Sequence, residues 1–351
     1  MQDNMMCGIV TFHDGINFGA YLQTYALHKY LLTLGIGNEV LNYKGLRHWF
    51  NEYYITLHTK NPILFAAILK KISKFKEAEK RINKTTFHVS TKPFTERRYK
   101  ALFFGSDEIW NFRQRQVGFN PFYFGEGLHA DRLISYAASC GNLTEETVVP
   151  DKIKKLLSRF HYASVRDESS KKIIEQCIGK QVEIVVDPTL LYDFESEAID
   201  CPYKDYILIY STLFDREMKS KLKQYARAKG KKLISIGYYN DFCDMNEISI
   251  GPFEFLGLIK KADMVVTSMF HGVLLSVKYN KNVSIIVDPY RVNKLSTILK
   301  ILSLEGKVYR PEQCTLERLL EEEIDYAHIN AVLNEERAKS ADFIRNALGM
   351  Q

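Results

Sequence analysis

The sequence predicts an α/β protein with two facing, doubly wound domains and a helical C-terminus. Short apolar segments alternate with segments of helical spacing, which is typical of parallel sheets covered by helices. The alternation runs in two series, and 351 residues with a 46% apolar fraction allow about two ordinary cores. We predict an N-terminal domain at 1–200, a C-terminal domain at 201–325 and a C-terminal helix at 326–351.

The first series predicts a parallel sheet interrupted by a basic insertion at 44–100. "CGIVTF" is typical of a strand, and "GAYLQTYALHKYLLTLG" (19–35) of a helix ended by glycine. Asp167 lies where it can cap a further helix. The predicted strands are 7–12, 39–43, 101–105, 132–139, 162–166 and 182–188.

The second series predicts another sheet, with helices at 215–230, 252–262 and 272–280 and a mostly helical chain from about 292. The predicted strands are 206–210, 232–237, 264–268 and 283–288. Ligands of such sheets bind beyond the carboxyl ends of the strands, and two facing domains form a cleft. This rule singles out five segments: 13–19, 105–111, 139–141, 166–167 and 268–272.

Positive charge is concentrated in one block. The net charge is +6, but residues 44–100 carry 14 Lys and Arg against 4 Asp and Glu. Aromatic residues are not interleaved with this charge at a base-stacking spacing, so we expect no nucleic-acid partner. Residues 61–84, "NPILFAAILKKISKFKEAEKRINK", fit an amphipathic helix in peripheral contact with an anionic membrane, or a solvated helix packed on the first domain.

The composition predicts a cytoplasmic protein. The longest apolar run, "PILFAAIL", is too short to span a bilayer. The six cysteines are scattered, which favours reduced thiols. His and Cys residues lack the spacing of a zinc site, and we expect no metal.

The segment "TFHDGINFGAYLQTYAL" follows the first strand and carries the polar candidates His13 and Asn17. Backbone N–H groups of a glycine-containing turn can hold an anion. The spacing of Gly15 and Gly19 is not that of a dinucleotide fingerprint, and both glycines equally fit simple turn geometry.

The segment "FFGSDEIWN" (103–111) offers Ser106, Asp107 and Trp110 at a strand end. Asp107 can bind or deprotonate a sugar hydroxyl, and Trp110 can stack on a pyranose ring. The alternative is that Ser106 or Asp107 caps a helix while Trp110 lies in the core.

Two segments offer anion-binding groups. Arg166, in "SVRDES", presents a planar fork for phosphate or carboxylate, or forms an ion pair within the chain. In "TSMFHG", Ser268 can cap a helix whose first turn contains His271 and Gly272, and Gly272 allows a ligand to approach. Exposed N–H groups and the helix dipole favour an anion there, although a single histidine is often structural.

Taken in order, these segments resemble the polysaccharide pyruvyl transferase family. The matching stretches are "TFHDGINFGAYLQTYAL", "FFGSDEIWN", "ISYAAS", "ASVRDESS", "VEIVVDPTLL" and "ADMVVTSMFHG". The resemblance implies two facing Rossmann-like domains similar to GT-B glycosyltransferases. It implies transfer of a pyruvyl group from phosphoenolpyruvate to a sugar of a capsule, exopolysaccharide or cell-wall polymer, often while that sugar is lipid-linked. The product is a cyclic ketal, and no cofactor is needed beside the donor substrate.

The resemblance also suggests roles for the candidate residues. His271 and Asp107 are the catalytic candidates, with Asp107 on the acceptor side in the N-terminal domain. The donor-binding candidates are Arg166, Ser268, Gly272 and Arg291, and the donor side is assigned to the C-terminal domain. The acceptor-binding candidates are His13, Asn17, Ser106 and Trp110.

One departure from the family pattern keeps other functions open. Many relatives carry an arginine two residues before the histidine, and others carry "DSFHG", whereas this chain has Ser268 and Met269. Arg166 or Arg291 would then supply the cation. The alternatives are a nucleotide-sugar glycosyltransferase of the same architecture, although no clear ribose-binding acid motif is found, and a glycan-binding protein without catalysis.

Overall fold

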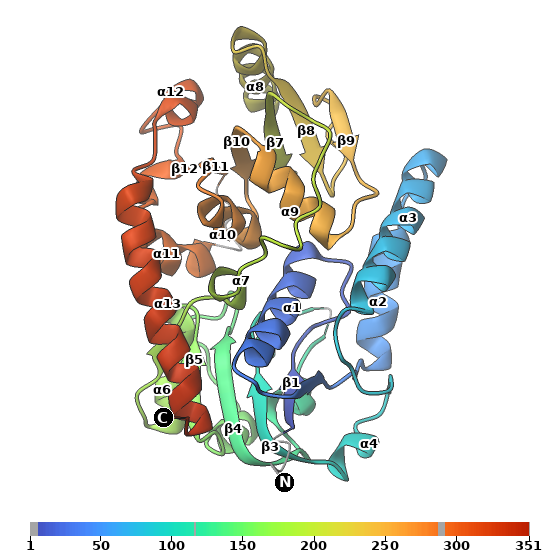
Figure 1. The fold of residues 1–351 in the computed structure, drawn as a ribbon, viewed down its shortest axis with the longest axis vertical. Helices are drawn as coiled ribbons and strands as arrows, with labels where there is room; N and C mark the ends of the chain where they lie inside the picture. Colours follow the sequence, from blue (N-terminus) through green and yellow to red (C-terminus); the bar gives the residue numbers. More distant parts are fainter. Residues whose placement is uncertain (1–5, 116, 287–291, 351) are drawn as a thin grey trace. The chain divides into compact units, whose positions relative to one another are not determined.

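The computed structural model describes residues 6–115, 117–286 and 292–350, which fold into two compact units. Unit 1 comprises residues 1–58, 79–192 and 334–351, and unit 2 comprises residues 59–78 and 193–333. Residues 59–78 thus fold with the second half of the chain, and residues 334–351 fold with the first half. In Figure 1 the strands of the first sheet along the chain are coloured blue to green and those of the second yellow to orange.

Unit 1 contains a parallel six-stranded sheet in the order β2-β1-β3-β4-β5-β6. Its strands are β1 (Cys7–Val10), β2 (Asn38–Val40), β3 (Arg98–Phe104), β4 (His129–Ala138), β5 (Tyr162–Val165) and β6 (Glu183–Ile184). Its helices include α1 (Phe18–Thr33), α2 (Leu46–Leu57), α4 (Lys92–Thr95), α5 (Asp151–Leu157), α6 (Glu168–Ile178) and α7 (Pro188–Leu191).

Unit 2 contains a second parallel six-stranded sheet, in the order β12-β11-β10-β7-β8-β9. Its strands are β7 (Tyr206–Tyr210), β8 (Lys232–Ile236), β9 (Met245–Glu247), β10 (Met264–Thr267), β11 (Asn282–Ile286) and β12 (Val308–Tyr309). Its helices include α8 (Arg216–Ala228), α9 (Pro252–Lys261), α10 (Phe270–Lys278), α11 (Val292–Ile301) and α12 (Leu316–Glu321). Two helices divide between the units, namely α3 (Pro62–Glu79) and α13 (Tyr326–Leu348).

Apolar sequence explains the central strands. Every residue of β1, β7 and β10 is buried. A strand covered by helices on both faces is expected to be a continuous apolar run, as in "YILIY". These strands supply the core of each unit and bring their polar C-terminal neighbours to one edge of the sheet.

Each sheet reverses its strand order at one point. In unit 1 the reversal lies between β1 and β3, and in unit 2 between β7 and β10. Ligands of doubly wound sheets bind outside the carboxyl ends of the strands at this switch point. The residues that follow these four strands are therefore the first candidates for a site.

The predicted doubly wound α/β fold with a helical C-terminus is confirmed. The ten predicted strands are all present, with ends shifted by a few residues. The short edge strands β9 and β12, of three and two residues, were not predicted. Within the described residues, no helix is long and apolar enough to cross a membrane.

Candidate active site

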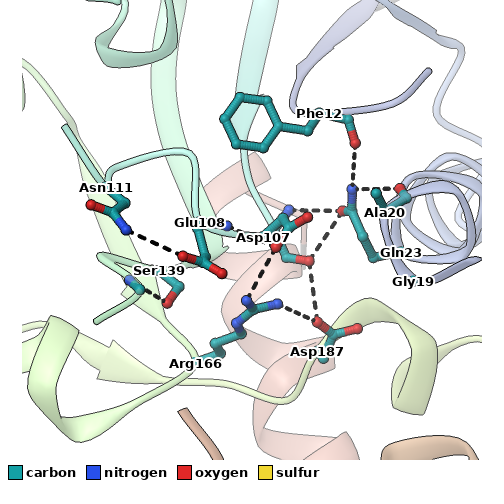
Figure 2. A network of polar contacts seen from close by, with 12 residues as sticks. Phe12, Gly19, Ala20, Gln23, Asp107, Glu108, Asn111, Ser139, Arg166 and Asp187 are labelled. Carbon is teal, nitrogen blue, oxygen red and sulfur yellow. Dashed lines mark hydrogen bonds and ion pairs between the residues drawn. The ribbon is translucent and has the colours of Figure 1, made fainter. Parts of the chain in front are cut away.

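Buried polar groups join β1, β3 and α1 at the switch point of unit 1 (Figure 2). The Thr11 hydroxyl, just after β1, donates to the carbonyl of Ser106, just after β3, at 3.0 Å. Gln23 of α1 donates to Thr11 Oγ1 at 3.1 Å and accepts from the backbone N–H and the hydroxyl of Ser106, both at 3.1 Å. Ser106 is therefore fixed within the protein, and its predicted acceptor contact would require it to give up these bonds.

Arg166 lies between two carboxylates in the same network (Figure 2). Its Nη1 is 3.0 Å from Asp187 Oδ2 and its Nη2 is 3.3 Å from Asp107 Oδ1. The Arg166 side chain is only 2% exposed. The guanidinium thus forms the intra-chain ion pairs that the sequence left open as an alternative, and its position in this structure favours orienting Asp107 over binding a donor.

Asp107 is the least enclosed member of this network. Its side chain is 21% exposed. Its Oδ1 also accepts from the backbone N–H of Glu108 at 2.9 Å. Asp107 has a φ of 71°, which is uncommon for a residue other than glycine and persists where the surroundings fix it. Arg166 and the turn therefore hold a carboxylate with one accessible end at this sheet edge.

His13 and Asn17 make hydrogen bonds that stabilise the loop after β1. His13 is buried, with Nε2 2.9 Å from Asn42 Oδ1 and Nδ1 3.2 Å from the carbonyl of Thr11. Asn17 caps α1, accepting from Gly19 N at 2.9 Å and Ala20 N at 3.2 Å. Both side chains are thus engaged in shaping the turn, which the sequence allowed as the alternative to acceptor binding.

Trp110 lies in the core. The indole is 1% exposed, its Nε1 donates to the carbonyl of Tyr123 at 3.2 Å, and its ring meets Phe160 edge-to-face at 5.4 Å. The role in sugar stacking conflicts with this burial, because a ring enclosed by the core has no face for a pyranose. The sequence alternative, with Trp110 in the core, describes this structure.

A second buried charge cluster holds the loop after β1 against α2. Lys44 Nζ lies 3.0 Å from Asp14 Oδ1 and also pairs with Glu52. Glu52 accepts from the backbone N–H of Ile16 at 2.8 Å. Burial alone would raise the pKa of Asp14, but the charges of His13 and Lys44 lower it below its usual value. The cluster of Lys44, Asp14 and Glu52 therefore holds the loop between β1 and α1 in place.

His48 of α2 packs beside this cluster in a neutral state. Its ring meets Phe12 edge-to-face at 5.4 Å. Its Nδ1 is buried and has no hydrogen-bond partner among the described residues. Burial, with the nearby Lys44 charge, lowers the pKa of His48 to about 4. Protonation of His48 is therefore unfavourable in the folded protein.

Hydroxyl groups join β7 and β10 at the switch point of unit 2. The Ser211 hydroxyl, just after β7, donates to Ser268 Oγ, just after β10, at 2.8 Å. Asn240 donates to the carbonyl of Ser211 at 3.0 Å and to Ser235 Oγ at 2.8 Å. Ser268 does not cap α10, as the sequence suggested it can, because its hydroxyl bridges the two strand ends.

Helix α10 differs from α6 and α8 in the residue at its N-cap. Its N-cap is Met269, which makes no side-chain capping bond. By contrast, α6 and α8 are capped by Asp167 and Asp215. His271 lies in the first turn of α10 and is 9% exposed. The partial positive charge of this helix start is thus not offset by its own N-cap.

Gly272 is required by packing within unit 2. A Cβ atom there would lie 2.3 Å from Thr267 Oγ1 and 2.9 Å from Tyr210 Cδ1. The Thr267 hydroxyl donates to the carbonyl of Tyr210 at 2.8 Å and accepts from Met269 N at 3.0 Å. Close packing of α10 on the strand ends therefore explains this glycine without the ligand approach that we predicted for it.

The structure gathers Ser106, Asp107 and Arg166 in unit 1, and Ser268, His271 and Gly272 in unit 2. The predicted donor residue Arg291 lies outside the described residues. Gln23, Asp187, Ser211 and Asn240 were missed. Asp187 lies near the end of the predicted strand 182–188 and Ser211 follows the predicted strand 206–210, so the rule of strand ends could have found both. A glutamine inside a helix gives no such signal. Within the described residues, no cluster of three or more His, Cys, Asp or Glu side chains could hold a metal ion.

A solved structure of a sugar-nucleotide enzyme shares this fold. A UDP-N-acetylglucosamine 2-epimerase aligns at 10% identity with a TM-score of 0.56, over 99% of this chain and 96% of its own. The UDP-GlcNAc 2-epimerase of Methanocaldococcus jannaschii, in complex with UDP-GlcNAc and UDP, aligns at 12% identity and a TM-score of 0.48, over 98% and 99%. The E. coli heptosyltransferase WaaC with ADP aligns at 10% identity and a TM-score of 0.46, over 95% and 100%. The predicted GT-B-like architecture is confirmed, and at these identities the likeness concerns the fold alone.

Sequence comparison assigns the family. No match is found among curated proteins. The family model described as polysaccharide pyruvyl transferase matches residues 17–287, more than three quarters of the chain. The matched range contains the switch point of unit 2 and the residues Asp107, Arg166 and Asp187 of unit 1, whereas β1 precedes it. This chain belongs to the polysaccharide pyruvyl transferase family.

Proposed function

We propose that the protein transfers a pyruvyl group from phosphoenolpyruvate to a sugar and forms a cyclic ketal. The observation that carries the proposal is the start of α10 at the switch point of unit 2, where the N-cap Met269 makes no side-chain capping bond and His271 lies in the first turn. The membership in the family supplies the class of reaction. The donor would then be bound by unit 2.

The chemistry of this helix start suits the donor. Phosphoenolpyruvate carries a phosphate and a carboxylate, which require converging hydrogen-bond donors and positive charge. First-turn N–H groups and the dipole of α10 provide both. The Met269 side chain cannot compete for these N–H groups, and the hydroxyls of Ser211 and Ser268 lie at the adjoining strand ends.

The reaction balances without an external reductant or oxidant. A proton adds to the methylene carbon of phosphoenolpyruvate, and one sugar hydroxyl oxygen adds to C2 while losing its proton. The bond from C2 to the phosphate oxygen then breaks, and a second hydroxyl of the same sugar takes its place. The products are the pyruvate ketal and inorganic phosphate.

His271 and Asp107 are the residues to which we assign proton transfer. His271 binds the donor or delivers the proton to its methylene carbon, because imidazole exchanges protons near neutral pH. Asp107 acts on the acceptor hydroxyl as a base. Arg166 is a positioning residue that holds Asp107 in place, and Arg291 is kept as a donor-binding cation.

The acceptor is a sugar of a surface polysaccharide precursor, which we propose to be lipid-linked and reached from the cytoplasm. The family makes such precursors the expected class. The acceptor sugar must carry two hydroxyls whose spacing allows both oxygens to bond to C2 of the pyruvyl group and close a ring.

The test measures phosphate release from phosphoenolpyruvate in the presence of a panel of free and lipid-linked sugars. The pyruvate ketal is followed in parallel by its methyl proton resonance. We expect both signals for one acceptor, and a loss of about 10²–10⁴-fold in kcat/KM for His271→Gln. His28→Gln, which alters a buried histidine of α1 bonded to Asn38, is the matched control and should retain activity.

Two outcomes would replace the proposal. Release of UDP from UDP-sugars, with no phosphate from phosphoenolpyruvate, would indicate glycosyl transfer. Saturable sugar binding with no turnover of either donor would indicate a glycan-binding protein.

A further inference from the structure

The first half of α3 is apolar and uncovered. Every residue from 62 to 71 is exposed or half-buried, although residues 62–69, "PILFAAIL", carry no charge. Exposure is 81% for Ile63, 46% for Leu69 and 39% for Phe65. A helical segment that is apolar on all sides normally lies in a core or in a membrane, because water is an unfavourable environment for it.

The second half of α3 is anchored. Ile72, Phe75 and Ala78 are buried. Lys74 forms an ion pair with Glu254 in the first turn of α9, within the same unit. The uncovered half therefore continues, along one helix, from a half that is fixed to unit 2.

Positive charge accompanies the apolar segment. The exposed Lys60 precedes it, and the exposed Lys70 and Lys76 follow it. Residues seven apart lie on the same face of a helix, so Lys70 shares a face with Ile63 and Lys76 with Leu69. Each of these lysines is about 10 Å along the helix from its apolar partner.

We infer that the N-terminal half of α3 docks on an anionic lipid bilayer. The apolar side chains enter the boundary between headgroups and acyl chains, and the lysines contact the anionic headgroups. Charge complementarity selects this occupant, because residues 59–78, the part of the chain in unit 2 that contains this segment, hold five Lys against one Glu. The inference goes beyond the proposed function and holds whichever donor the protein uses.

The dimensions fit insertion into one interface of the bilayer. Eight helical residues extend about 12 Å, against about 30 Å for the hydrocarbon core. An interfacial helix inserts about 5–10 Å. Docking through α3 would hold the protein at the surface where lipid-linked sugars are found.

The experiment measures co-sedimentation of the full chain with vesicles, without substrate. Vesicles of phosphatidylcholine with 30% phosphatidylglycerol are compared with pure phosphatidylcholine, at 0.1 M and 0.5 M NaCl. We expect binding to the anionic vesicles that weakens at high salt. Ile63→Ser/Leu69→Ser should reduce the partition coefficient more than tenfold, and Lys70→Gln/Lys76→Gln about fivefold per lysine.

The matched control replaces two apolar residues of equal exposure elsewhere. Val148 is 80% exposed and Ile199 is 47% exposed, close to Ile63 and Leu69. Val148→Ser/Ile199→Ser should bind vesicles as the wild type does. Absence of binding to anionic vesicles, or equal binding by Ile63→Ser/Leu69→Ser and the wild type, would overturn the inference. Self-association that Ile63→Ser/Leu69→Ser abolishes, without vesicle binding, would instead identify a second copy as the occupant and also overturn it.

Discussion

The two switch points share one topology, but the side chains that join their strand ends differ in chemistry. In unit 1, charged groups form ion pairs with one another, since Arg166 lies between Asp187 and Asp107. In unit 2, the strand ends are joined by neutral hydroxyls, Ser211 to Ser268, beside a helix start whose N-cap, Met269, makes no side-chain capping bond. A paired charge network resists an added ion, whereas the dipole at a helix start favours an anion.

This difference suggests a division of labour. The network of unit 1 keeps one carboxylate, Asp107, in a fixed and partly exposed position. Unit 2 offers His271 and backbone N–H groups, which suit an anionic donor. If the comparison is correct, charge deletions should affect mainly the stability of unit 1, and polar deletions at β10–α10 should affect mainly donor affinity.

The largest expected effect is the loss of the buried guanidinium. Arg166→Met leaves Asp187 buried without its partner, so the free energy of unfolding should fall by about 3–5 kcal/mol. Urea denaturation measures this change. Arg159→Met is the control, since Arg159 is exposed and bonds backbone carbonyls at 2.8 and 3.3 Å. A loss no larger than that of the control would show that the network is not what holds this sheet edge.

Adding Asp187→Asn to Arg166→Met sharpens the test. Removing both charges should restore part of the lost stability, because an unpaired buried charge costs more than a neutral pair. A double variant less stable than Arg166→Met would contradict the account of this network.

A smaller effect is expected from pH, again in unit 1. His48 is neutral in the folded protein with a pKa of about 4, while the unfolded chain protonates near pH 6.5. Unfolding is therefore favoured as the pH falls through this window, by about 2 kcal/mol between pH 7 and 4.5. His48→Phe should remove this part of the pH dependence and leave the rest. His328→Gln, at an exposed position of α13, should follow the wild-type curve, and a parallel curve for His48→Phe would refute the assignment.

The smallest expected effect on stability is in unit 2, where one substitution should change donor affinity and another should not. Ser268→Ala removes one neutral hydrogen bond and should lower the free energy of unfolding by about 1 kcal/mol. It should also weaken phosphoenolpyruvate binding about fivefold, as measured by calorimetry. Ser276→Ala, within α10, removes a bond to the carbonyl of Gly272 and should leave the affinity unchanged. Equal phosphoenolpyruvate affinities of the two variants would show that Ser268 does not contribute to donor binding.

The sequence predicted the strand ends better than the partners of the side chains there. Apolar runs followed by helical spacing located His271 and Asp107 at sheet edges. The pairing of Arg166 with Asp187 depends on how strand ends meet in space, and spacing along the chain does not encode it. The burial of Trp110 was likewise not predictable, because the sequence around a tryptophan after a strand does not show whether its ring points to solvent or to the core. The attachment of residues 59–78 to unit 2 is likewise a long-range contact, seen in the pair of Lys74 and Glu254.

The measurement that tests the central claim most directly is a calorimetric titration of phosphoenolpyruvate, with UDP-GlcNAc as the comparison ligand. It is made on the wild type, His271→Gln and Asp107→Asn, after circular dichroism has shown that each variant is folded. We predict saturable phosphoenolpyruvate binding that weakens more than tenfold in His271→Gln and changes less than twofold in Asp107→Asn. Binding that weakens in Asp107→Asn but not in His271→Gln, or binding of UDP-GlcNAc alone, would contradict the assignment of the donor to the start of α10.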